Sequence, residues 1–195
     1  MTYYLKRELA GMARRALEQM PVVVISGMRQ VGKSTMLLRD PAFKGREYIS
    51  LDDFALLEAA KNDPESILGR SKRVTIDEAQ RCPELFPAIK KLVDADGTKG
   101  RFLLSGSANV SLLRQVTESL AGRAIYLNLL PITLRERRRS IDKEPLLLRF
   151  ARELKLPDSR AHPASITDDM VLTGGMPQVL VGGVRDRGIW FKGYE

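Results

Sequence analysis

The sequence has few of the residues that form disulfides or bind zinc. Its 195 residues include one cysteine, Cys82, and one histidine, His162. A single cysteine excludes an intramolecular disulfide and a zinc site made of cysteines, and it suits a reducing compartment. His162 stands alone in a loop-like stretch, so we assign it no role.

Long hydrophobic runs are also missing from the sequence. No stretch approaches the roughly 20 apolar residues that a membrane-spanning helix needs. The amino-terminal Lys6, Arg7 and Glu8 are not followed by an apolar run, as they would be in a signal peptide. We therefore expect a cytoplasmic protein with no membrane partner.

The charge is basic but spread along the chain. Hydrophobic residues make up 44% and charged residues 29%, as in ordinary globular domains, and the formal net charge is +8. Such an excess is compatible with phosphates, nucleic acid or an anionic surface as partners. Only residues 135–139 are densely basic, and a solvated helix face explains them, so charge alone does not indicate DNA binding.

Short apolar strands alternate with helical segments through most of the chain. An amphipathic helix with Leu5, Leu9, Met12, Ala16 and Leu17 on one face opens it. Strands are expected at 22–25, 48–51, 73–77, 102–105 and 124–127. Helices are expected at 33–39, 54–61, 64–68, 83–93 and 110–120. This alternation predicts an α/β fold, a parallel five-stranded sheet between two helical layers.

Two domains are expected. Residues 1–130 form the α/β core, and residues 131–195 form a smaller, helical, lid-like segment. In this segment 132–154 is expected to be helical, 157–163 to be a loop, and 173–177 to be a turn before a last helical piece.

A glycine-rich motif follows the first expected strand. Residues 27–34 fit G-x-x-x-x-G-K-[ST], the pattern of a phosphate-binding loop or P-loop. In such a loop, glycines let backbone N–H groups surround a phosphate, and the following helix directs its positive end at the same oxygens. Lys33 would bridge the β- and γ-phosphates and Ser34 would ligate Mg²⁺. The expected nucleotide-binding residues are Gly27, Met28, Arg29, Gln30, Val31, Gly32, Lys33, Ser34 and Thr35.

Two carboxylates end the third expected strand. In P-loop proteins the acidic residue at this place holds the Mg²⁺ shell, so Asp77 joins Ser34 as a metal residue. Glu78, directly after it, could orient and deprotonate water for attack on the γ-phosphate. A kinase needs no such base, because its substrate supplies the nucleophile. The pair therefore indicates hydrolysis.

Three further residues are candidates for catalysis. Ser105 and Asn109 follow the fourth strand, and either could lie between the γ-phosphate and the attacking water, with Ser105 preferred. Small residues that complete a turn are the alternative. Arg123 could neutralise charge in cis or in a neighbouring subunit, or could be structural.

The nucleotide is expected to be ATP. No Asn-Lys-x-Asp guanine-reading motif is present. Residues 77–80 look like a helicase DEAD/DEAQ box, but no second motor domain follows to complete a helicase cleft.

Several segments together resemble one family. The loop 27–35 and residues 76–80 are joined by 102–107, 120–123, Leu130-Pro131 with Glu136, and 174–177. In this order they resemble the predicted AAA+ superfamily ATPases that carry an AAA_14 core and a DUF4143 C-terminal domain. The resemblance implies sheet order 5-1-4-3-2 and ATP-driven conformational work in the cytoplasm.

The sequence departs from this family at two places. Met28 stands where the family often has proline, and the chain stops after Trp190 and Phe191, where relatives continue into the C-terminal domain. This predicts a truncated core that lacks a domain or a partner chain, and a homo-oligomer is an alternative. The functional alternatives to an ATPase are an ATP-binding switch with little turnover and a nucleic-acid-dependent ATPase.

Overall fold

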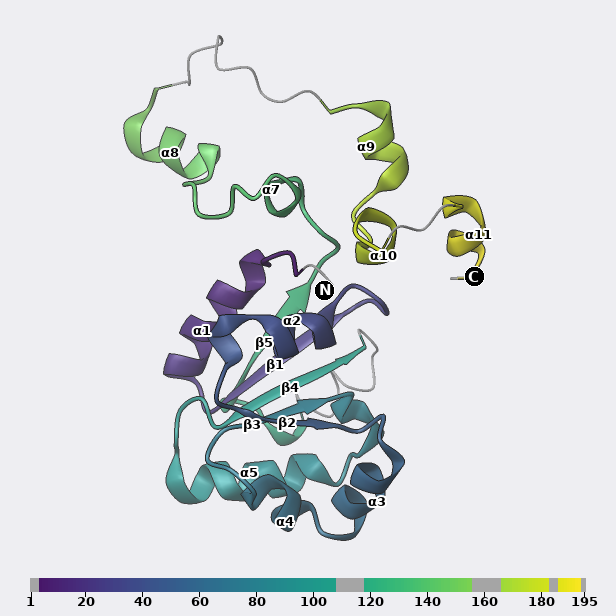
Figure 1. Cartoon of the computed structure of the whole chain (residues 1–195). Coiled ribbons are helices and arrows are strands. Elements are labelled where there is room, and N and C mark those ends of the chain that lie inside the picture. The colour runs from purple at the N-terminus through teal and green to yellow at the C-terminus, as the bar shows by residue number, and fades with distance from the viewer. Residues whose placement is uncertain (1–3, 108–117, 156–165, 183–185, 194–195) are drawn as a thin grey trace. The chain divides into compact units, whose positions relative to one another are not determined.

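The protein separates into two compact units. The computed structural model describes residues 4–107, 118–155, 166–182 and 186–193. The larger unit is Tyr4–Leu130 and the smaller is Pro131–Glu195 (Figure 1). The expected loop 157–163, Asn109 and most of the expected helix 110–120 lie outside the described residues.

The larger unit is built on a sheet of five parallel strands. Their order is β2-β3-β4-β1-β5, which is the predicted order read from the other edge. Every pair in the sheet is parallel. The strands are β1 Val22–Gly27, β2 Glu47–Ser50, β3 Val74–Asp77, β4 Phe102–Ser107 and β5 Ala124–Leu129. The predicted α/β class and sheet are confirmed.

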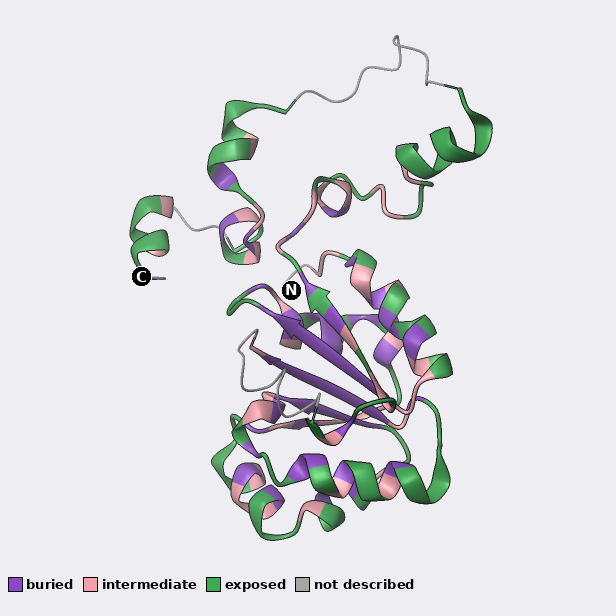
Figure 2. Cartoon of the chain, turned by 180° about the vertical axis from the view of Figure 1, so that it is seen from behind, coloured by how far each residue is buried: buried purple, intermediate pink, exposed green. Residues whose placement is uncertain are grey.

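Helices cover both faces of this sheet (Figure 1). One layer holds α1 Glu8–Gln19, α2 Lys33–Arg39 and the 3-10 turn η1 Pro41–Phe43, and the other holds α3 Phe54–Asn62, α4 Pro64–Gly69 and α5 Leu85–Asp96. The central strand β1 packs against both layers. Val23 and Ile25 contact the first layer, and Val22 and Val24 contact the second. The central strands are buried on both faces (Figure 2), which explains their continuous apolar sequences.

Helix α1 packs on the sheet partly through the predicted stripe, because Ala16 is buried and Leu9 and Leu17 pack, partly buried, against the same core. Its buried residues are Ala10, Ala13 and Ala16, whereas Met12 is 48% exposed. The helix begins at Glu8, so Leu5 precedes it. The three small side chains allow the helix backbone to lie close to the strands.

The smaller unit contains short helices. They are α7 Leu134–Arg137, α8 Leu146–Glu153, α9 Asp168–Thr173, α10 Pro177–Leu180 and α11 Arg187–Lys192. The single helical stretch expected at 132–154 is wrong, because Arg139 is left-handed at φ 52° and a new helix begins only after its N-cap residue Pro145. No described helix is long and apolar enough to cross a membrane.

Candidate functional site

The loop 28–32 joins the carboxyl end of β1 to the start of α2. Gly32, the residue before the helix, has φ 96° and ψ 24°, a left-handed conformation that favours glycine. A Cβ on Gly27 would lie 2.7 Å from the Leu129 carbonyl oxygen of β5. The first glycine of the motif is therefore required by the close approach of a neighbouring strand, and the last by the turn into the helix.

Lys33 holds its ammonium group over this loop. Its Nζ donates to the carbonyl oxygens of Gly27 and Met28, at 3.0 Å each, and the residue is 5% exposed. Burial lowers the pKa of Lys33, while the carboxylates of Glu78 and Asp77 act in the opposite direction. The lysine cation is thus bonded to the glycine-rich loop and is favoured electrostatically by the two acidic residues at the end of β3.

Asp77 is the centre of a buried hydrogen-bond cluster. It is 2% exposed and accepts bonds from the Tyr48 hydroxyl at 2.5 Å, the Glu78 N–H at 3.1 Å and the Ser105 hydroxyl. Burial, and then the bond to Asp77, raise the pKa of Tyr48, whereas a hydrogen bond with Ser34 lowers it. Tyr48 therefore connects Ser34, in the first turn of α2, with Asp77 of β3.

Glu78 leaves the strand direction immediately after Asp77. It has φ 56° and ψ 41°, and it precedes the 3-10 turn η2 Ala79–Arg81. Non-glycine residues held in this conformation are often found at functional sites. The Gln80 side-chain amide donates to the Glu78 carboxylate, and the Gln80 Oε1 atom is buried with no hydrogen-bond partner among the described residues. The carboxylate is thus held on its own turn, partly open to solvent.

Ser105 lies beside Asp77, one of the other candidate residues. It is completely buried, and its hydroxyl donates to Asp77. This placement favours a role in orienting Asp77 over direct contact with an attacking water. Asn109, the second choice for that contact, lies outside the described residues.

Arg123 lies at the opposite end of the sheet from the loop, where the parallel strands begin. Its carbonyl accepts a bond from Val22, the first residue of β1, whereas the loop follows the last residue of β1. The two ends of β1, six residues long, are roughly 17–20 Å apart. Its guanidinium pairs with Asp94 through Nε at 2.5 Å and Nη2 at 2.9 Å. This position argues against action in cis on the same nucleotide, because Arg123 precedes β5 rather than following it. Action on a neighbouring subunit remains a prediction.

The sequence did not reveal the role of Arg7. This side chain is 4% exposed and donates to the carbonyl oxygens of Val31, at 2.9 Å, and Leu130, at 2.5 Å. It ties the loop to the residue that follows β5. No sequence pattern marks Arg7, because it stands beside Lys6 and Glu8 in an apparently surface-exposed stretch.

The oxygen donors at this edge suit Mg²⁺. Carboxylate and hydroxyl oxygens are ligands of the kind that this cation prefers. The described bonds to Asp77 come from neutral donors, so no ion pair competes for its charge. Ser34 and Asp77 are the residues that would hold the cation, together with phosphate oxygens. The described residues contain no cluster of three or more His, Cys, Asp or Glu that could hold a metal.

The parallel sheet and its glycine-rich loop define a nucleotide-binding domain of the AAA-type P-loop ATPase class. Within this class, residues 19–137 match the AAA domain family AAA_14, and the chain belongs to that family. Membership supports ATP binding and ATPase activity in general terms. The match ends before most of the smaller unit, so a DUF4143 domain stays a prediction.

The curated relatives are larger proteins. The uncharacterized proteins Rv2008c of Mycobacterium tuberculosis and Mb2031c of Mycobacterium bovis are each 41% identical to this chain over 133 residues. These matches cover 67% of this chain and 30% of the relatives. The chain therefore spans about a third of the length of the curated relatives it matches.

Solved structures share the fold. The Walker-type ATPase PABY2304 of Pyrococcus abyssi aligns with TM-score 0.53 and 18% identity, over 91% of this chain and 66% of that one. PH0952 of Pyrococcus horikoshii, a signal transduction ATPase with a tetratricopeptide repeat sensor, aligns with TM-score 0.53 and 16% identity, over 97% and 31% of the two chains. At these identities the likeness concerns the fold alone.

Proposed function

We propose that this chain binds ATP with Mg²⁺ at residues 27–35 and hydrolyses it to ADP and phosphate. The observation that carries the proposal is the position of Asp77 and Glu78. They end the strand that lies two places from β1 in the sheet, and they act electrostatically on Lys33 of the loop. In this proposal Lys33 is the phosphate-binding cation, Asp77 holds the metal and Glu78 is the carboxylate base, all at the carboxyl ends of the parallel strands.

Each residue has a defined part in the reaction. Glu78 takes a proton from water as the water oxygen bonds to the γ-phosphorus. The bond from that phosphorus to the β–γ bridging oxygen breaks, and its electron pair stays on ADP. Lys33 neutralises the charge that grows on the phosphate oxygens. Mg²⁺, when bound by Ser34 and Asp77, contributes further neutralisation.

Hydrolysis would then move residues 131–195. Arg7 supports this part of the proposal, because it bonds both Val31 in the loop and Leu130, the last residue before the smaller unit. A change in the loop can therefore reach the end of β5 through one buried side chain.

Phosphate release from ATP with Mg²⁺ tests the proposal. Lys33→Ala should remove ATP binding. Glu78→Gln should keep ATP affinity and lower turnover by about 100-fold or more, the usual contribution of a general base. Glu58→Gln is a matched control, because Glu58 is a partly exposed carboxylate on α3 whose described partner is Lys61. Turnover of Glu78→Gln at the parental rate would exclude Glu78 as the base.

A second candidate is an ATP-binding switch with little turnover. The observation that favours it is the hydrogen bond from Gln80, which already occupies the Glu78 carboxylate. ATP binding without phosphate release, in the parental chain and in Glu78→Gln alike, would support the switch over the enzyme.

A further inference from the structure

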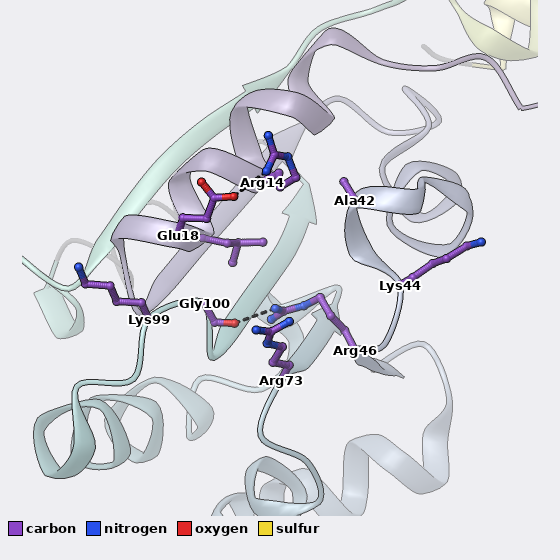
Figure 3. Close-up of a pocket in the computed structure, with 9 residues that line it drawn as sticks. Arg14, Glu18, Ala42, Lys44, Arg46, Arg73, Lys99 and Gly100 are labelled. Atoms are coloured by element: carbon purple, nitrogen blue, oxygen red, sulfur yellow. Dashed lines mark hydrogen bonds and ion pairs between the residues drawn. The ribbon is translucent and has the colours of Figure 1, made fainter.

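A cavity of about 470 Å³ lies where the parallel strands begin, at the opposite end of the sheet from the glycine-rich loop (Figure 3). It belongs entirely to the larger unit. Its walls come from the end of α1, from η1 and the residues after it, and from the segments that precede β2, β3 and β4. The lining residues are Arg14, Leu17, Glu18, Ala42, Lys44, Arg46, Arg73, Lys99 and Gly100.

Arg46 provides a fixed positive charge in this cavity. Its guanidinium donates only to neutral oxygens among the described residues, at 2.7–3.0 Å. These are the Thr75 hydroxyl and the carbonyls of Gly100, Val74 and Arg101. Burial, and then the nearby charge of Arg73, lower the pKa of Arg46 to about 10. The cation is thus held in place with no carboxylate to balance it.

The other cations increase this imbalance. Arg14 pairs with Glu18, the single carboxylate of the lining, at 2.6 Å. Lys44, Arg73 and Lys99 form no ion pair within the described parts of the chain. In Figure 3, Arg73 lies beside Arg46, while Lys44 and Lys99 start at the rim and their side chains point away from the two arginines. Like charges gathered around a hollow attract anions and raise their local concentration.

The wall segments are fixed to one another by backbone hydrogen bonds. Gly100 donates to Met20 at 2.8 Å, and Glu47 donates to Arg73 at 2.9 Å. Arg46 bridges the starts of β3 and β4 through its bonds to Val74 and Arg101. The positive charges therefore stand on rigid elements, which reduces the entropy lost when a ligand binds.

The chemistry of the lining selects the kind of ligand. The volume is within the range of small-ligand sites. The lining has no aromatic side chain on which a base could stack. Arginine forks and lysine ammonium groups bind phosphate oxygens well. Recognition would therefore rest on phosphate charge rather than on base identity.

We propose that this cavity is a phosphate-binding site separate from the nucleotide loop, which takes the phosphates of a nucleic-acid backbone or of a small polyphosphate. It lies roughly 17–20 Å from the loop, the length of the six-residue strand β1. The proposal does not depend on ATP hydrolysis, because none of its residues takes part in that reaction.

Two matched triple variants test this proposal. Lys44→Ala/Arg73→Ala/Lys99→Ala removes exposed cations of the cavity that form no described ion pair. Lys61→Ala/Lys90→Ala/Lys91→Ala removes the same charge from exposed positions on α3 and α5. Thermal unfolding of both should stay near that of the parent, since exposed substitutions seldom change stability much.

Two probes distinguish the source of the phosphate. The first is a labelled single-stranded 12-nucleotide DNA, measured by fluorescence anisotropy over a range of salt concentrations. The second is tripolyphosphate, measured by calorimetry with each triple variant in the Lys33→Ala protein, so that the loop does not contribute. If the parent binds a probe, the cavity variant should bind that probe about 10-fold or more weakly than the control variant does. With DNA, the loss of three phosphate contacts should reduce the salt slope by roughly 2.

Each outcome decides the proposal. A selective loss of DNA binding in the cavity variant supports a nucleic-acid strand as the source. A selective loss of tripolyphosphate binding alone supports a small polyphosphate. Equal affinities of the cavity and control variants for both probes, or no binding of either probe by the parent, would overturn it.

Discussion

The hydroxyl of Ser105 offers a direct test of the cluster around Asp77. Ser105→Ala removes a hydrogen bond to a buried carboxylate, and such bonds to charged groups contribute about 1.5–3 kcal/mol. Asp77 is 2% exposed, so water cannot easily replace the lost donor. We therefore expect the free energy of unfolding to fall by about 2–3 kcal/mol. For a domain of this size, the melting temperature should fall by roughly 5–12 °C.

Calorimetry or chemical denaturation measures this change, and Ser107→Ala is the matched control. Ser107 lies two residues further along β4 and is partly exposed, so its substitution should change stability by less than about 0.5 kcal/mol. Tyr48→Phe removes a second donor to the same carboxylate. The double variant should lose more than the sum of the single variants, because the second loss leaves Asp77 with fewer donors. Equal stability of Ser105→Ala and Ser107→Ala would refute the reasoning.

Three further predictions concern other parts of the larger unit. Gln80→Leu removes the donor to Glu78, so phosphate release should change at least several-fold while ATP affinity stays within about twofold; equal turnover would show that Gln80 does not restrain the base. Arg7→Met removes two bonds from a buried cation to carbonyl oxygens, and should lower the free energy of unfolding by about 3–5 kcal/mol, whereas Arg15→Met, at an exposed site on α1, should have little effect. Burial, and then a bond with Glu84, raise the pKa of Cys82 to about 11. The contribution of the neutral thiol to the free energy of unfolding is therefore complete below about pH 9 and is lost between pH 9 and 11. Cys82→Ala should flatten the profile of stability against pH over that range, and an unchanged profile would contradict this.

The fold was largely readable because buried parallel strands have continuous apolar sequences. Residues 22–25 and 102–105 were found for this reason, although both strands extend two residues further. The interruption at Arg139 was not readable, because a left-handed arginine has no sequence signature. On α1 the predicted stripe misses Met12, which is exposed, and omits Ala10 and Ala13, which are buried in the same core as Leu9, Ala16 and Leu17. Small side chains give a weak amphipathic signal, so the sequence pattern favours the larger residues.

The candidate site was predictable where a local motif defines it. Lys33 and Ser34 follow from their spacing to the glycines, and Asp77 from its place at a strand end. The role of Tyr48 depends on the register between β2 and β3, in which Tyr48 lies opposite Thr75 and Ser50 opposite Asp77. That register is a property of the folded sheet. Arg123 is different, because its place before a strand already indicates the edge away from the loop.

The contacts of Arg7 bear on where this domain can be cut. The family match begins at residue 19, after nearly all of α1 and after Arg7. A fragment trimmed to the matched residues would lose the guanidinium that bonds Val31 in the glycine-rich loop and Leu130 beyond β5. Similarity among relatives therefore marks a shorter region than the one that holds the loop in shape. Residues that precede the matched region are therefore needed to hold the candidate site in shape.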